Sequence, residues 1–181
     1  LTWSDIDFEK KKIKVCKQLL YQDKQWCFAP LKTINSYRSV NITAEFAQYL
    51  ADMKMQYDAE RKLYGDGYKR NFVTDRREPK KEKVIEVPDF INVKANGEML
   101  TTNGAKFLAR IIKKDLGIHF KFHNLRHTYA TVLAENGLNP RYVQEMLGHS
   151  KLEFTLRYYT HITEKMSDAA ENALTAAFRF D

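Results

Sequence analysis

The sequence FHNLRHTYATVLAENGLNPRYVQEMLGHSKLEFTLRYYTH, residues 122–161, decides how this chain folds. Its apolar spacing predicts a helix over 123–136 that stops at Gly137. Asn139-Pro140 opens a second helix, because proline at the first helical position gives up an N–H that has no helical partner anyway. Gly148 ends that helix, and a third is predicted over 152–160. This part of the chain is therefore predicted to be entirely helical.

The first of these helices separates into two faces at 100° per residue. Leu125, Tyr129, Val132 and Leu133 lie on one face, and His123, Arg126, His127 and Ala130 lie on the other. We expect the first face to meet the core. His123 and Arg126 then project together near a helix N-terminus, where an anion is favoured. A histidine and an arginine placed in this way can donate several hydrogen bonds to a phosphate.

Upstream of these helices, residues 12–42 predict one small antiparallel sheet. Its three strands are Ile13 to Tyr21 with period-two alternation, Trp26 to Phe28, and Arg38 to Ile42. Residues 22–24 suit a turn between the first two strands, and residues 30–36 must connect the second to the third. The stretch 65–88 is rich in charge and poor in periodicity, so we expect a loop there.

Three further helices are predicted. Thr43 caps one that ends at Gly65, Thr101 or Thr102 caps one that ends before Gly117, and a last one covers 163–178. The middle helix is expected to bury Phe107, Leu108, Ile111 and Ile112. The predicted fold is therefore α+β and mainly helical, with a small antiparallel three-stranded sheet packed beside a helical bundle.

Composition indicates one domain with an anionic partner. The chain has 181 residues, a net charge of +7, and nine Lys or Arg against four acids within residues 61–83. Such charge favours nucleic acid, although many basic proteins bind no polyanion. No apolar run reaches the roughly 18 residues of a membrane span. Cys16 and Cys27 are expected to be free thiols in a reducing cytoplasm.

Three motifs give the chain a family resemblance. They are His123-Asn124-Leu125-Arg126-His127-Thr128, Leu147-Gly148-His149-Ser150, and Thr155-Leu156-Arg157-Tyr158-Tyr159-Thr160-His161. In this order they resemble the signature of tyrosine site-specific DNA recombinases, most closely the integrases of Gram-positive phages and conjugative transposons. Residues 30–38 are similar to the hairpin that supplies the family's catalytic lysine, and residues 1–7 to the segment that follows its first catalytic arginine.

The resemblance implies a domain organisation. Residues 1–181 are expected to be the catalytic domain without its first helices, and the core-binding and arm-binding domains are expected upstream. The family's first catalytic arginine lies in a Gly-x-Arg-x-x-Glu segment that this sequence does not contain. Losing one such oxyanion donor costs on the order of 10²–10³ in rate, so we expect the chain by itself to be almost inactive.

The resemblance also implies a mechanism without metal or cofactor. Tyr159 is the implied nucleophile, Arg126 and His149 hold the phosphate oxygens, His123 transfers the tyrosine proton, and Lys32 protonates the departing 5′-oxygen. The expected DNA-contacting residues are Thr33, Ser36, Arg38, His127 and Ser150. The partners implied are double-stranded attachment sites, three further copies in a tetramer synapsed on DNA (with a free monomer), and an accessory directionality factor, for a phage or mobile element. The tail at 163–178 is expected to pack against a neighbouring protomer.

Several alternatives stay open. Tyr158 adjoins Tyr159 and points about 100° away, and Lys32 suits an ordinary solvated turn. His123 and His127 have a metal-like spacing, but Arg126 between them would repel a cation. A helix-turn-helix DNA-binding module without chemistry would use 139–147 and 152–159. A type IB topoisomerase would share the chemistry but relax supercoils.

Overall fold

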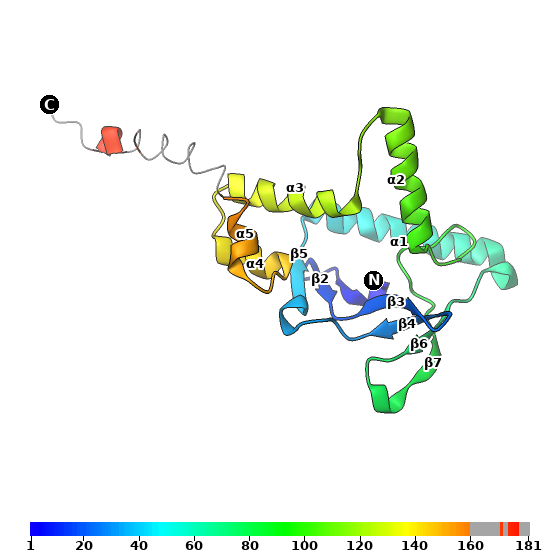
Figure 1. The fold of residues 1–181 in the computed structure, drawn as a ribbon. Coiled ribbons are helices and arrows are strands. Elements are labelled where there is room, and N and C mark those ends of the chain that lie inside the picture. Colours follow the sequence, from blue (N-terminus) through cyan, green and yellow to red (C-terminus); the bar gives the residue numbers. More distant parts are fainter. Residues whose placement is uncertain (160–170, 172–173, 178–181) are drawn as a thin grey trace. The chain divides into compact units, whose positions relative to one another are not determined.

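The strands of residues 1–119 form two sheets, where the sequence predicted one (Figure 1). The first sheet is antiparallel in the order β1-β2-β5, with β1 at Ile6–Asp7, β2 at Lys12–Val15 and β5 at Arg38–Asn41. The second has the order β3-β4-β6-β7, with β3 at Gln18–Gln22, β4 at Gln25–Ala29, β6 at Phe72–Asp75 and β7 at Lys83–Glu86. The prediction of a single sheet over 12–42 was therefore wrong.

A buried ion pair explains why the predicted first strand breaks in two. Lys17 lies between β2 and β3, and its ammonium is 2.5 Å from the carboxylate of Asp5. Both side chains are at most 10% exposed, and the Thr2 hydroxyl joins them. Because a buried charge needs a partner, Lys17 turns inward and does not continue the alternation of the strand. The two halves of the run then enter different sheets.

The expected loop over 65–88 contains a β-hairpin, which corrects that prediction. β6 pairs in parallel with β4, placing Thr74 opposite Cys27, and in antiparallel with β7. Two ion pairs join the two sides of this hairpin, Arg70 with Glu86 and Arg76 with Glu82. These charged positions hide the apolar alternation, which is why the sequence pattern missed both strands.

Local turn and cap signals were predicted correctly. Asp23 and Lys24 have positive φ angles of 51° and 62°, which suit the two-residue hairpin joining β3 to β4. The helix α1, Ala44–Tyr64, begins where the Thr43 hydroxyl accepts a hydrogen bond from the amide of Phe46 at 3.2 Å. Among the described residues, no helix is both long enough and apolar enough to cross a membrane.

Two aromatic clusters form the core of residues 1–119. One buries Phe28, Val73, Val87, Phe90 and Val93, and the other buries Trp3, Ile6, Leu50 and Ile91. The rings of Phe28 and Phe90 lie 5.8 Å apart, so β4 and the segment after β7 share one core. Leu50 comes from α1, which attaches that helix to the sheet β1-β2-β5.

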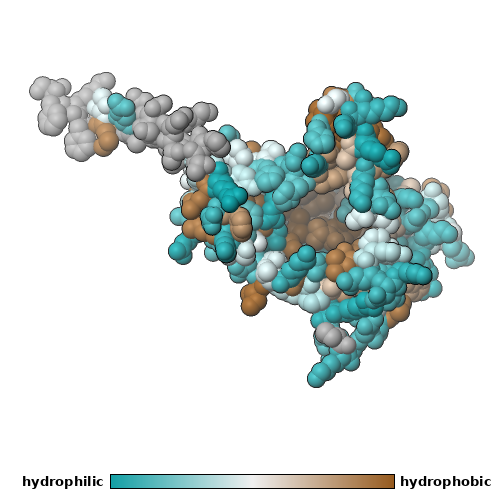
Figure 2. Space-filling view, viewed as in Figure 1, coloured by the Kyte–Doolittle hydropathy of each residue, from teal (hydrophilic) through white to brown (hydrophobic). Residues whose placement is uncertain are grey.

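The helix α2, Thr102–Leu116, has the predicted bounds but not the predicted burial. Gly117 ends it in the left-handed conformation at a φ of 68°. The apolar face expected to enter the core stays accessible, with Phe107 56% and Leu108 47% exposed, and apolar side chains are visible at the surface of α2 in Figure 2. The apolar period correctly identified an amphipathic helix, but it does not reveal what covers such a face.

The second unit, residues 120–181, contains α3 at Phe122–Glu135, α4 at Pro140–Leu147 and α5 at Leu152–Leu156. The structure describes residues 1–159, 171 and 174–177, so the last predicted helix falls mostly outside the described residues. The caps of α4 are those predicted, since the Asn139 side chain accepts from the amide of Arg141 and Gly148 has a φ of 69°.

The buried face of α3 is not the predicted one. Ala130 and Ala134 are fully buried, and of the predicted face only Leu133 packs against the same cluster, whereas Leu125 and Val132 are 55% and 47% exposed. Val143 and Leu147 of α4 pack against Ala130, because a face with small side chains lets a second helix approach closely. The face with Arg126 therefore meets α4.

Candidate functional site

Lys32 lies in the connection between β4 and β5, where the sequence placed it. Its side chain is exposed, and the loop around it is held by hydrogen bonds on both sides. The Pro30 carbonyl accepts from the Gln18 side chain at 2.7 Å, and the Leu31 amide donates to the Tyr37 hydroxyl at 3.1 Å. These bonds present Lys32 to solvent from a short, fixed loop.

Three expected DNA-contacting residues follow Lys32. The hydroxyls of Thr33 and Ser36 are 2.8 Å apart across the 3₁₀ turn Ile34–Ser36. The guanidinium of Arg38 donates to the Ser36 carbonyl at 2.9 Å. Because Lys32 and these residues belong to the first unit and the other site residues to the second, their convergence on one phosphate stays a prediction.

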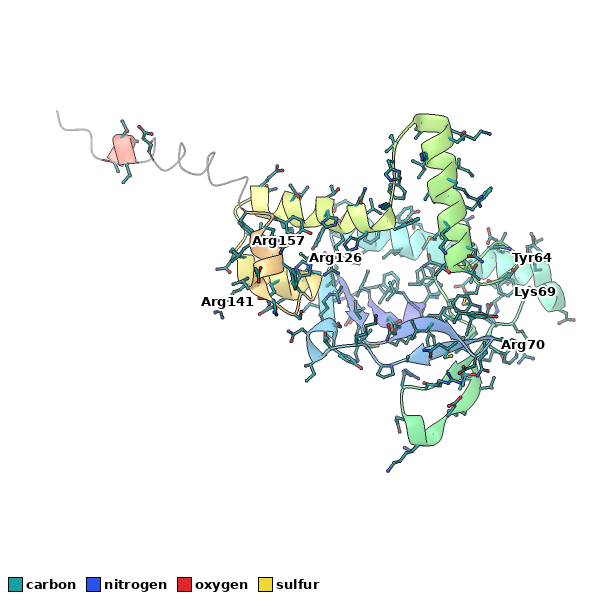
Figure 3. The ribbon with its side chains drawn as sticks, viewed as in Figure 1. Tyr64, Lys69, Arg70, Arg126, Arg141 and Arg157 are labelled. Carbon is teal, nitrogen blue, oxygen red and sulfur yellow. The ribbon has the colours of Figure 1, made fainter. Side chains whose placement is uncertain are left out.

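Arg126 ties α3 to the end of α4 (Figure 3). Its Nη2 donates to the Leu147 carbonyl at 2.6 Å. Burial lowers the pKa of this half-buried guanidinium, and the nearby Tyr158 hydroxyl opposes that shift. A guanidinium has five N–H donors, so one bond to a carbonyl orients the group and leaves other donors to hold an anion.

The two histidines of α3 lie beside each other at its start. The ring centroids of His123 and His127 are 4.6 Å apart with the planes nearly perpendicular, and both side chains are exposed. His123 and Arg126 thus share a face, as the helical wheel predicted.

The His149 ring and backbone are both held by hydrogen bonds from neighbouring residues. Its Nδ1 lies 2.9 Å from the hydroxyl of Thr155, which is fully buried, and its carbonyl accepts from the Gln144 side chain at 3.0 Å. A hydrogen bond to one ring nitrogen sets the direction in which the other nitrogen points. Ser150, the next residue, is exposed at the surface of the same turn.

The adjacent tyrosines have different partners. The Tyr158 hydroxyl is 2.5 Å from Nδ1 of His127, and the Tyr158 ring lies parallel to the His149 ring with centroids 6.5 Å apart. The Tyr159 hydroxyl donates to the Leu138 carbonyl at 2.5 Å, and burial raises the pKa of Tyr159. The structure thus brings Tyr158 to His127 and His149. Tyr159 as the nucleophile stays a prediction.

The contact of Tyr158 with His127 is the feature that the sequence did not indicate. Helical spacing separates the two tyrosines by about 100° but does not say which partner each one meets. That choice depends on how α4 packs between α3 and α5, which no local pattern encodes.

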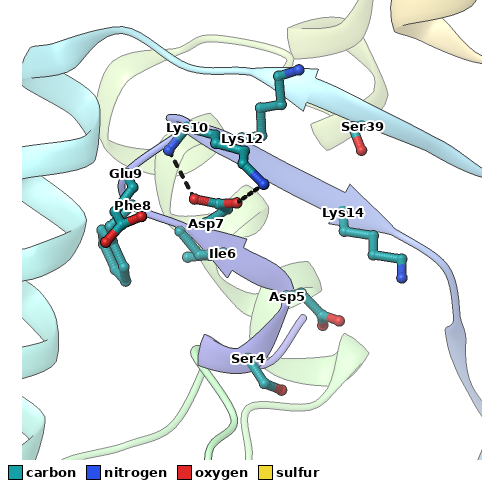
Figure 4. Close-up of a pocket in the computed structure, with 10 residues that line it drawn as sticks. All are labelled: Ser4, Asp5, Ile6, Asp7, Phe8, Glu9, Lys10, Lys12, Lys14 and Ser39. Atoms are coloured by element: carbon teal, nitrogen blue, oxygen red, sulfur yellow. Dashed lines mark hydrogen bonds and ion pairs between the residues drawn. The ribbon is translucent and has the colours of Figure 1, made fainter.

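A hollow on the sheet β1-β2-β5 contains none of the predicted site residues (Figure 4). Its lining includes the acids Asp5, Asp7 and Glu9 and the lysines Lys10, Lys12 and Lys14. The Asp7 carboxylate is 3.6 Å from the Lys10 ammonium. Because these opposite charges balance, the hollow has no excess charge to attract a phosphate, and we give it no role in the chemistry.

The fold and the order of the motifs are those of one protein family. The chain belongs to the phage integrase family, whose family model matches residues 1–166. It is 29% identical to a tyrosine recombinase XerC-like protein of Caldanaerobacter subterraneus subsp. tengcongensis, over 98% of this chain and 44% of that protein. It is 35% identical to tyrosine recombinase XerC of Listeria welshimeri, over 64% of this chain and 43% of the relative.

Solved structures give the same result. The integrase of the transposon Tn1549, in complex with transposon right end DNA, is 26% identical with a TM-score of 0.71, over 97% of this chain and 52% of that one. The fold of XerA recombinase is also similar, with a TM-score of 0.54. These likenesses confirm the predicted fold class and family. The chain spans about half the length of these relatives.

Proposed function

We propose that this chain is the greater part of the catalytic domain of a tyrosine-type site-specific DNA recombinase. The single observation that carries the proposal is the arrangement around Arg126. This arginine is fixed on the Leu147 carbonyl, two residues before His149, while the tyrosine pair packs against the same helices. Arginine, histidine and tyrosine together are what a metal-independent attack on a phosphodiester requires.

In the proposed reaction, Arg126 and His149 bind the non-bridging oxygens of the scissile phosphate. Negative charge grows on these oxygens as the nucleophile attacks, so fixed donors stabilise the transition state more than the ground state. The first catalytic arginine expected upstream would supply further donors.

Tyr159 attacks phosphorus, and His123 accepts the proton of its hydroxyl. The bond between phosphorus and the 5′-oxygen breaks, a 3′-phosphotyrosyl bond forms, and Lys32 protonates the departing 5′-oxygen. Attack by the 5′-hydroxyl of another strand reverses these steps and rejoins the DNA. The energy of the phosphodiester is kept in the tyrosyl bond, so no nucleotide cofactor is needed.

The proposed partners are double-stranded attachment sites of a prophage or mobile element. The Tn1549 integrase is in complex with its transposon DNA, and the net charge of +7 suits the same kind of ligand. We further propose that the protein acts in the cytoplasm, that four copies synapse on DNA, and that an accessory factor sets the direction of recombination.

The alternative of a helix-turn-helix module is less well supported. Its second helix would be α5, which ends at Leu156 after five residues and is short for a helix that lies along the major groove. That alternative also gives no role to Arg126 or His149. A type IB topoisomerase would form the same covalent bond, but it would relax supercoiled DNA without exchanging strands.

A covalent-trap assay tests the proposal on the full-length protein. The substrate is a nicked attachment-site duplex whose 5′-hydroxyl strand dissociates after cleavage. Because the DNA then cannot be rejoined, an SDS-resistant DNA adduct should accumulate. Tyr159→Phe should abolish the adduct while DNA binding persists. Tyr129→Phe, which removes a hydroxyl from the outer face of α3, is the matched control and should leave the adduct unchanged. A wild-type protein that binds the site without forming any adduct would refute the proposal.

A further inference from the structure

The hydroxyls of Tyr158 and Tyr159 are bound at opposite ends of α3. Tyr158 meets His127, in the second turn of that helix, and Tyr159 meets Leu138, three residues beyond its last residue Glu135. Because the Leu138 amide donates to the Leu133 carbonyl, the second anchor point lies beside the last turn of α3, about 9 Å along the helix from His127 at 1.5 Å per residue. The residues of the proposed phosphate site, His123 and Arg126, lie at the His127 end.

The Tyr159 hydroxyl therefore lies away from His123 and Arg126, the residues with which it is proposed to act. Its side chain packs beside the cluster of Ala130, Val143 and Leu147, and its hydroxyl donates to a backbone carbonyl. A phenol whose proton is engaged in this way, and whose pKa burial raises, is a poor nucleophile.

Tyr158 occupies the place that the substrate needs. Its hydroxyl is bound to His127 and its ring is parallel to that of His149, and Arg126 immediately precedes His127 on α3. A DNA phosphate that approaches Arg126 and His149 therefore meets the Tyr158 side chain. Because the tyrosines are consecutive residues on one turn, moving either hydroxyl to the other end of α3 moves both.

We propose that Tyr158 is a positioning residue: its hydrogen bond to His127 keeps Tyr159 retracted on Leu138, and this bond breaks before Tyr159 can attack DNA. The inference rests on the proposed function, since it assigns Tyr158 a role in the same reaction. We call this Tyr158–His127 hydrogen bond the latch. Binding of the phosphate breaks it, so Tyr159 can cleave only DNA that is correctly bound.

Tyr158→Phe in the full-length protein tests the latch, because it removes the hydroxyl and keeps the ring. With nicked attachment-site DNA at saturation, the rate of adduct formation should rise roughly threefold to tenfold, the effect of losing one ordinary hydrogen bond on the closed state. The Kd for DNA should change less than twofold. Tyr129→Phe is again the control. A merely structural role for Tyr158 would lower the rate, not raise it.

Several results would overturn the inference. An unchanged rate would show that the hydrogen bond between Tyr158 and His127 does not restrain Tyr159. A lost adduct in Tyr158→Phe together with a retained adduct in Tyr159→Phe would make Tyr158 the nucleophile. Failure of the proposed function is distinguishable, because the wild-type protein would then form no adduct at all.

A second measurement needs no cleavage. In protein with ¹³C-labelled tyrosine rings, the pKa of Tyr159 can be followed by NMR in the absence of DNA. Tyr158→Phe should move that pKa down toward the ordinary tyrosine value, because releasing the latch exposes the Tyr159 hydroxyl. A Tyr159 pKa that is the same in wild type and Tyr158→Phe would contradict the latch whatever the DNA assay gives.

Discussion

Lys17 in the first unit and Arg126 in the second are both at least half-buried cations, and they are held by different kinds of partner. In residues 1–119, Lys17 is bound to Asp5, Arg76 to Asp23 and Glu82, and Arg77 to Asp75. In residues 120–181 the exposed Arg157 pairs with Glu153, but the half-buried Arg126 is bound to a backbone carbonyl. The first kind of bond neutralises a charge, whereas the second orients the cation and leaves its charge uncompensated.

The cores differ in the same sense. The first unit is built on large side chains such as Trp3, Phe28 and Phe90, while the second is built on Ala130, Val143 and Leu147. Small residues let α4 lie close to α3, and this closeness is what brings the Leu147 carbonyl to Arg126. The buried cation of the first unit is thus neutralised by a carboxylate, and Arg126 in the second unit keeps a positive charge that can bind an anion.

The largest expected effect comes from an exchange of arginine for lysine in each unit. Arg126→Lys keeps the charge but loses the planar set of donors, so cleavage of bound DNA should fall on the order of 10²–10³-fold. Arg76→Lys, in which the charge stays paired with Asp23 and Glu82, is the matched control and should change the rate less than about twofold. Single-turnover kinetics on saturated DNA measure both. Equal losses would erase the distinction between the units.

A smaller effect is expected from acid. Burial acts to raise the pKa of Asp5, but hydrogen bonds from Lys17 and Thr2 outweigh it and hold that pKa below its usual value. A depressed carboxyl pKa stabilises the folded state above the unfolded value near about 4, and this stability is lost as the pH falls further.

Urea unfolding between pH 7 and pH 3 measures that loss. The wild-type free energy of unfolding should fall more steeply below about pH 4 than that of the double variant Asp5→Asn, Lys17→Met, which has no pair to protonate. Parallel curves would mean that the Asp5–Lys17 pair does not set the acid sensitivity of the first unit.

The smallest effect compares one helix cap in each unit. Thr43→Ala and Asn139→Ala each remove a side chain that accepts from a helix amide, so each should lower the free energy of unfolding by about 1 kcal/mol. Their effects on cleavage should differ. Asn139 adjoins Leu138, which holds Tyr159, so Asn139→Ala should alter the rate of adduct formation while Thr43→Ala should not. Equal rates would indicate that the Leu138 carbonyl is insensitive to the start of α4.

Local signals made most helices predictable from the sequence. Thr43, Asn139-Pro140, Gly117 and Gly148 mark helix ends through their own backbone and side-chain chemistry, and α1, α2 and α4 begin and end where these residues predicted. The His-x-x-Arg spacing likewise places His123 and Arg126 on one face wherever the helix packs. The motif order was enough to predict the family.

Non-local choices were not predictable in this way. Whether β2 and β3 share a sheet depends on Asp5, which buries Lys17, and β6 depends on a partner strand far upstream. The covered face of α3 depends on Val143 and Leu147 from another helix. The separate partners of Tyr158 and Tyr159 depend on that same packing.

The most direct test of the whole account is to identify the residue that carries the DNA. The trapped adduct of the full-length protein is digested with nuclease and with trypsin, which cuts after Arg157, and the peptide that begins at Tyr158 is sequenced by tandem mass spectrometry. The account predicts a nucleotide joined through a 3′-phosphate to the hydroxyl of Tyr159. A nucleotide on Tyr158, or on a residue outside this peptide, would contradict it.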